Sequence, residues 1–222
     1  MRIRVRHVVF LVAAALLVGC SAGSSASTTS HPVTTSSSSA GTAARAMATP
    51  SATASPSRGL LGVLPVPAGA TPWPGNTNAP MTLTSYVKMQ YSKSNWTEEK
   101  ALNARRGFVS AVQQGWTNPD GSGQYITLAR FASRAGVTSA LDEVISGFKR
   151  EPYPGKMLAD PAIGAVGWSR LTLDSQGDRD VEFGVAVGDT MIIAVEETAA
   201  TPDPAAAKAL LQRQYDRLKN GS

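Results

Sequence analysis

Cysteine and histidine are almost absent from this 222-residue chain. Its only cysteine is Cys20 and its two histidines are His7 and His31, so everything after residue 31 lacks both residue types. Ser-His-Asp and Cys-His nucleophile systems are therefore excluded from that part of the chain. The usual zinc, copper and non-haem iron sites are excluded too, because they depend on imidazole or thiolate ligands. The glycine loops that bind phosphates are also missing. We expect no catalytic residue, no metal site and no cofactor.

Acidic and aromatic residues are missing from residues 21–59. Ser, Thr and Ala dominate this segment, with Pro32, Pro50 and Pro56 among them. Such a composition cannot bury enough apolar surface to offset the entropy of the chain. We therefore predict that residues 20–59 form a disordered tether and that residues 60–222 form a single folded domain.

The N-terminal segment has the pattern of a secretory signal. Arg2, Arg4 and Arg6 precede an unbroken apolar run from Val8 to Val18, which is too short to span a bilayer. Leu17-Val18-Gly19-Cys20 then resembles the cleavage box of bacterial lipoproteins at each of its four positions. The pattern predicts a signal peptide over residues 1–19, lipid attachment at Cys20, and a protein anchored in the outer leaflet of the cell membrane on its extracytoplasmic face. The alternative is an ordinary secreted protein with a chance cysteine.

The net charge of +5 does not describe the predicted domain. Three of the 21 basic residues lie in the signal segment, and Arg45 and Arg58 lie in the tether, which leaves 16. All 16 acidic residues follow residue 59, so residues 60–222 have no net charge. A basic surface for nucleic acid is therefore not expected.

Hydrophobic periodicity predicts the first half of the domain. Residues 60–80 are rich in proline and are typical of extended chain, with an edge strand at 62–66. A helix is expected over 82–93, and a second from Asn95 to Gly107, although 103–107 also fits the start of a strand. Strands at 108–116 and 124–131 flank Asn118-Pro119-Asp120-Gly121, a strong turn signal, and should form a hairpin.

The second half of the domain is predicted to contain two helices and three strands. A helix over 134–149 places Val137, Leu141, Val144, Ile145 and Phe148 on one stripe. Strands are expected at 167–173, 179–187 and 190–198, and a closing helix begins at Pro204 with Asp203 as its N-cap. This order predicts an α+β fold: an antiparallel meander of about five to six strands in a three-layer α/β/α sandwich. Helices 134–149 and 203–219 are expected on one face and the N-terminal helix on the other.

Several short motifs resemble a family pattern. They are Arg106-Gly107-Phe108, Trp116, Asp120-Gly121, Leu128-Ala129-Arg130-Phe131, and the tail Pro202-Asp203-Pro204 with Gln214-Tyr215. Together they resemble secreted lipoproteins of high-GC Gram-positive bacteria with a PsbP-like α/β/α sandwich domain. That resemblance implies a non-enzymatic module for binding or assembly. The motifs occupy turn and core positions, so they identify no site.

The remaining candidate site residues are carboxylates and aromatics. Asp174, Asp178, Asp180 and Glu182 surround one turn, where a solvated hairpin tip is favoured over a Ca²⁺ site. Glu196 and Glu197 alternate along a strand and so face opposite sides of the sheet. Trp73 and Trp96 fall in predicted loops and are the aromatic side chains that we expect to face a ligand, although core packing is the commoner role of such residues.

Three functional hypotheses follow. The leading one is an envelope lipoprotein whose non-enzymatic domain binds a protein or an apolar ligand. The alternative is a carboxylate-dependent hydrolase of cell-wall glycans, which needs two acids facing one cleft. The third is a structural or regulatory ectodomain for a membrane enzyme or transporter, which a large exposed apolar patch would favour.

Overall fold

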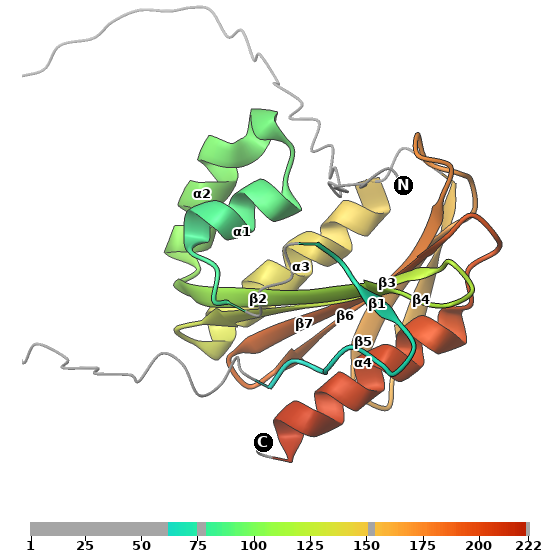
Figure 1. Cartoon of the computed structure of the whole chain (residues 1–222). Helices are drawn as coiled ribbons and strands as arrows, with labels where there is room; N and C mark the ends of the chain where they lie inside the picture. The colour runs from blue at the N-terminus through green and yellow to red at the C-terminus, as the bar shows by residue number, and fades with distance from the viewer. Residues whose placement is uncertain (1–61, 75–78, 151–153, 221–222) are drawn as a thin grey trace, which may run out of the picture. The chain divides into compact units, whose positions relative to one another are not determined.

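The computed structural model of the chain describes residues 62–74, 79–150 and 154–220, all of which fall within one compact unit. The predicted signal segment and tether, residues 1–19 and 20–59, lie outside the described residues. The elements, in chain order, are β1 (Thr71–Pro72), α1 (Leu83–Gln90), a 3₁₀ turn (Lys93–Asn95), α2 (Trp96–Arg105), β2 (Phe108–Thr117), β3 (Gly123–Phe131), α3 (Arg134–Arg150), β4 (Gly155–Asp160), β5 (Ala165–Arg170), β6 (Arg179–Val187), β7 (Thr190–Thr198) and α4 (Pro204–Lys219) (Figure 1).

The strands form one open antiparallel sheet in the order β1-β2-β3-β7-β6-β5-β4. This confirms the predicted α+β class, with seven strands rather than five to six. The two additional strands are both at the edges. The edge strand predicted at 62–66 is wrong, because that stretch lies on the α4 side without strand pairing, and the two-residue β1 pairs with β2 instead. The second strand that the sequence pattern does not predict is β4, at the opposite edge of the sheet.

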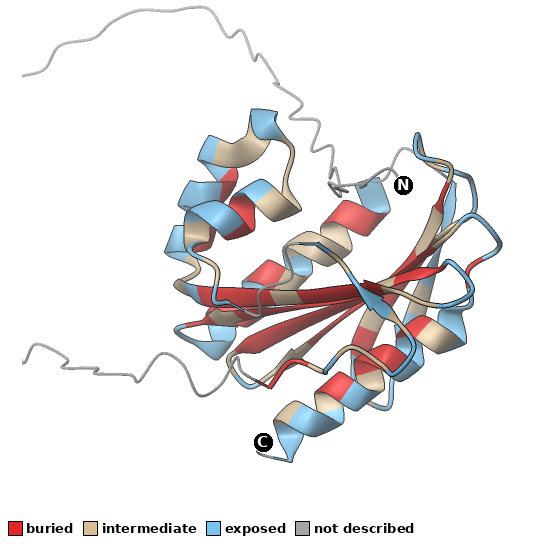
Figure 2. Ribbon diagram, viewed as in Figure 1, coloured by how far each residue is buried: buried red, intermediate tan, exposed pale blue. Residues whose placement is uncertain are grey.

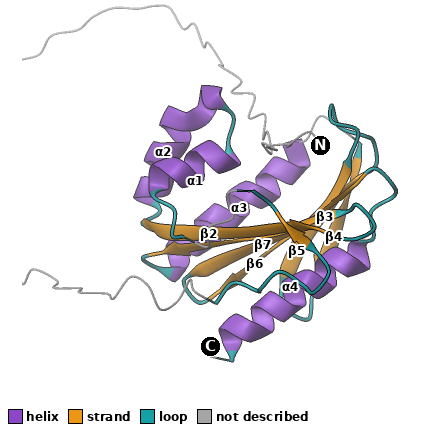
Figure 3. Ribbon diagram, in the orientation of Figure 1, coloured by secondary structure: helices purple, strands orange, loops and turns teal. Residues whose placement is uncertain are grey.

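Helices cover both faces of the sheet, as expected for a three-layer sandwich (Figures 1 and 3). Their assignment to the faces differs from the prediction. α1 and α3 share one face with Met191, Ile193 and Val195 of β7, whereas α4 packs on the opposite face against Ile192 and Ala194. The central strand is apolar on both sides, so each face of β7 needs its own helix. Figure 2 shows this buried centre flanked by exposed helix surfaces.

Local signals explain the helix ends. The Thr82 hydroxyl accepts a hydrogen bond from the Ser85 N–H and caps α1. α1 ends at Gln90, three residues before the predicted end at Lys93, because Tyr91 adopts an extended backbone. Gly107, with a φ of 77°, reverses the chain between α2 and β2, which supports the helix and not a strand starting at 103–107. Asp203 caps α4 as predicted.

The segment that precedes β1 is attached to α4 by a single side chain. Gln214 is fully buried; its Oε1 accepts from the Leu64 N–H at 2.9 Å and its Nε2 donates to the Gly62 carbonyl at 3.0 Å. Val63, between them, joins the core beneath α4. We call residues 62–66 the strap and these two hydrogen bonds the Gln214 clamp. Among the described residues, no helix is long and apolar enough to cross a membrane.

Candidate functional site

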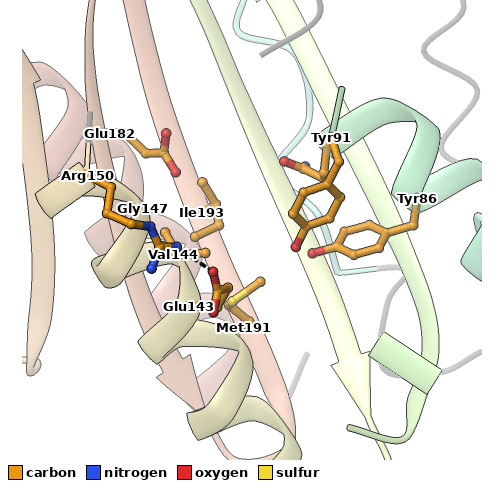
Figure 4. Close-up of a pocket in the computed structure, with 10 residues that line it drawn as sticks. Tyr86, Tyr91, Glu143, Val144, Gly147, Arg150, Glu182, Met191 and Ile193 are labelled. Carbon is orange, nitrogen blue, oxygen red and sulfur yellow. Dashed lines mark hydrogen bonds and ion pairs between the residues drawn. The ribbon is translucent and has the colours of Figure 1, made fainter. Parts of the chain in front are cut away.

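A pocket lies between α1 and α3 above the central strands of the sheet. Its empty space is about 430 Å³, part of which is open to solvent. Four elements and the residue after α1 supply its walls (Figure 4). The lining residues are Tyr86, Gln90, Tyr91, Glu143, Val144, Gly147, Arg150, Glu182, Met191 and Ile193.

The pocket has an apolar floor and two phenol groups in its wall. Met191 and Ile193 point from β7 to the α1–α3 side, where Val144 joins them from α3. Tyr86 and Tyr91 enter from the opposite side with their rings directed into the pocket (Figure 4). Burial raises the pKa of both phenols well above the ordinary value. Both hydroxyls therefore remain protonated at neutral pH and can donate hydrogen bonds.

Charged side chains occupy the α3 wall. Arg150 Nη2 lies 2.6 Å from Glu143 Oε1, and Arg106 Nη2 approaches the other carboxylate oxygen at 3.8 Å. Arg106 also donates from Nε to the Ser139 hydroxyl. The buried Glu182 carboxylate adds a second acid from β6. The pocket therefore combines an apolar floor with a polar wall, which is the lining that a ligand with both kinds of surface requires.

A row of polar side chains lies behind Tyr91 on one face of α2. Glu99, Asn103 and Arg106 follow one another at helical spacing. In the described structure, Glu99 Oε2, Asn103 Oδ1 and Arg106 Nη1 are buried without hydrogen-bond partners. The Tyr91 phenol lies beside this row, since Glu99 and Asn103 both act on its pKa. We call Glu99 and Asn103 of α2, together with Arg106 at its C-cap, the polar stripe.

Glu99 gives the site a measurable pH dependence. Burial, and secondarily the charge of Glu143, raise its pKa above the ordinary value. The folded state therefore binds a proton more readily than the unfolded state, so charged Glu99 lowers stability above its folded pKa, and the penalty disappears below the unfolded pKa of about 4.3. Glu99→Gln is expected to raise the free energy of unfolding at pH 7.5 but not at pH 3.5, as measured by urea denaturation.

Glu98→Gln is the matched control for this prediction. Glu98 is the exposed neighbour on the same turn, so its replacement should leave stability nearly unchanged at both pH values. A Glu99→Gln protein that is less stable than the parent at pH 7.5 would show instead that the attraction of Arg106 outweighs burial.

The two tryptophans predicted to face a ligand do not line this pocket. Trp73 covers Gly115 and Tyr125 and donates from Nε1 to Thr117. Trp96 begins α2, donates to the Tyr91 carbonyl at 2.9 Å and lies beneath the Lys88 ammonium group. Both side chains thus have packing roles in the structure, and a ligand contact at either stays a prediction.

The acidic cluster predicted around residues 174–182 is divided among separate roles. Asp174 accepts from the backbone N–H groups of its own turn, Asp180 pairs with Arg170 at 2.6 Å, and Glu182 joins the pocket. No group of three metal-ligating side chains is found among the described residues. Glu196 faces the α4 side and Glu197 lies beside Trp73 on the other, as the alternation predicted.

The sequence pattern does not predict the pocket as a unit. It assigns Tyr86 and Tyr91 to the apolar face of one helix and Glu182 to an acidic turn, so nothing brings them together. Glu143 is the one residue whose position gives a signal. It lies directly beside Val144 of the apolar stripe of α3, and a carboxylate next to an apolar surface is stabilised by a charged partner. Its partner Arg150 lies two turns further along α3.

No family model matches this chain, and no curated protein matches it. Among solved structures, it is similar to the extracellular domain of PknH from Mycobacterium tuberculosis. The similarity covers 60% of this chain and 71% of that chain, with 7% sequence identity and a TM-score of 0.43.

Proposed function

We propose that this protein is a lipid-anchored lipoprotein on the extracytoplasmic side of the membrane, and that its domain binds an amphiphilic ligand without transforming it. The observation that carries the proposal is the lining of the pocket. An apolar floor of Met191, Ile193 and Val144 faces phenol hydroxyls and the Glu143–Arg150 ion pair.

The lining specifies the orientation of the ligand. Burial of a hydrocarbon chain against Met191 and Ile193 contributes about 25 cal/mol for each Å² of apolar surface removed from water. The polar end then lies against Tyr86, Tyr91 and the ion pair, where its lost water contacts are replaced by hydrogen bonds. The Cys20 anchor would keep such a domain close to the bilayer, where amphiphiles are concentrated.

The hydrolase hypothesis has one supporting observation, since Glu143 and Glu182 both line the pocket. Glu143, however, is engaged by Arg150 and Arg106, which makes it a wall component more than a proton carrier. The ectodomain hypothesis rests on exposed apolar side chains. Among the described residues the large ones are Val109 on β2, Met157 on the edge strand β4, and Leu171 and Leu173 directly after β5. Binding of an amphiphile is therefore the function that we favour.

Filling the pocket tests this proposal. In the unacylated Cys20→Ala protein, Val144→Trp should place an indole over the apolar floor and weaken binding of dodecyl-chain amphiphiles at least about tenfold, because the buried chain loses its contact surface. Isothermal titration calorimetry with 1-monolauroylglycerol measures the effect.

Val109→Trp is the control, because Val109 is exposed on β2 away from the pocket. Equal binding by the two variants would place the ligand elsewhere. Turnover of a cell-wall glycan by the parent protein would contradict a purely binding function.

A further inference from the structure

The buried side chains of α2 are polar. Of its residues, only Glu99 and Asn103 are buried, and each has a buried oxygen without a partner in the described structure. Burying unpaired polar atoms lowers stability, and an apolar residue at either position would avoid that penalty. Each of these buried oxygens calls for a partner, such as a ligand group or an ordered water.

Two residues connect this polar stripe to the pocket. Tyr91 lines the pocket, and its phenol lies close enough to Glu99 and Asn103 for these side chains to act on its pKa. Glu143 lines the pocket from α3 and contacts Arg106. The stripe is therefore separated from the pocket by one layer of side chains, at the end where the polar wall lies.

We infer that the polar stripe, Glu99, Asn103 and Arg106, is the head-group end of the pocket and selects an amphiphile with an uncharged, hydroxyl-bearing head. This inference rests on the proposed binding function. A head lying between Tyr91 and Glu143 reaches the stripe when the Tyr91 side chain rotates aside. Such a rotation changes the side-chain torsions of Tyr91 and not its backbone, which follows α1 in an extended conformation.

The unpaired atoms define the chemistry of the head. Glu99 Oε2 and Asn103 Oδ1 are acceptors, and Arg106 Nη1 is a donor. A hydroxyl group both donates and accepts, so it satisfies atoms of either kind. A phosphate or carboxylate would leave the two acceptors without donors and would be repelled by Glu99 and Glu143. An ammonium group could donate to the two acceptors, but it would leave Arg106 unmatched and would be repelled by it.

A series with one tail and different heads tests the selectivity. Binding of 1-monolauroylglycerol, dodecyl phosphate and dodecylamine to the unacylated Cys20→Ala protein is compared by calorimetry. The glycerol head should bind about tenfold more tightly than either charged head, which is the difference expected for one or two matched hydrogen bonds. Equal affinity for all three would overturn the inference but leave the proposed function standing. No binding of any of them would refute the proposed function itself.

A substitution that leaves the fold intact tests whether the polar stripe is the source of the preference for the glycerol head. Asn103→Leu replaces the buried amide by an apolar group of similar size and should keep or raise the melting temperature while abolishing the preference for the glycerol head. Gln114→Met is the matched control, because Gln114 also has a buried unpaired amide oxygen but belongs to β2 outside the pocket. It should leave the preference unchanged. An unchanged preference in Asn103→Leu would show that the stripe holds buried water only.

Discussion

Replacing Cys20 by alanine is expected to move nearly all of the protein from the membrane fraction to the soluble fraction. The proposed anchor consists of acyl chains on this residue, and two chains of ordinary length contribute on the order of 20 kcal/mol of membrane affinity at about 0.8 kcal/mol for each buried CH₂. Fractionation of cells followed by immunoblotting measures the change, and the intact mass of the parent protein should show the added acyl groups.

Ser21→Ala is the control for this experiment. It changes the next residue of the chain, outside Leu17-Val18-Gly19-Cys20, and should leave the protein in the membrane fraction. If the Cys20→Ala protein sediments with membranes after a high-pH wash, the anchor lies elsewhere in the chain.

The second large effect is expected at Gly136, in the first turn of α3. A Cβ atom there would overlap the backbone carbonyl oxygen of Arg106 and press on Phe131. Glycine-to-alanine changes inside helices normally stabilise by up to about 1 kcal/mol. Here we expect Gly136→Ala to destabilise by about 2–3 kcal/mol, because neither backbone segment can move without disturbing the core. The melting temperature should fall by about 5–10 °C in a domain of this size.

Gly177→Ala separates this clash from ordinary glycine effects. Gly177 has a φ of 83°, but a Cβ atom added to it would meet no other atom within 4 Å, so only backbone strain of about 1 kcal/mol is expected. Calorimetric melting of both variants decides the point. A Gly136→Ala protein as stable as the parent would mean that α3 does not lie against the end of α2, and the pocket wall would then need revision.

The strands and helices with regular patterns were predictable from the sequence. α3 and α4 were found because five apolar residues fit one helical stripe and because Asp203-Pro204 marks a clean start. β4 was missed because an edge strand paired on one side only is mostly exposed and shows no apolar alternation. Its Lys156-Met157-Leu158 stretch follows two prolines and resembles a loop. Neighbouring β5, which it pairs with, was placed two residues too late.

The site was less predictable than the fold. Tyr91 shows why: it matches the apolar spacing of the helix before it, so the pattern assigned it to that helix, yet it turns out of α1 and into the pocket. The sequence pattern also cannot predict which face of the sheet each helix covers. An apolar stripe shows that a helix packs on a sheet, but not on which side, and α1 and α3 create the pocket because they share a side.

The Gln214 clamp has a mechanical consequence. A pull on the chain from its N-terminal side reaches the described domain at Gly62, and there it first meets two hydrogen bonds from one side chain of α4. Those bonds lie inside the core beside Val63, so water cannot readily replace them as they lengthen. Tension is thus passed to the long C-terminal helix on one face of the sheet. The helices that form the pocket are on the other face, so this tension would reach them through the sheet.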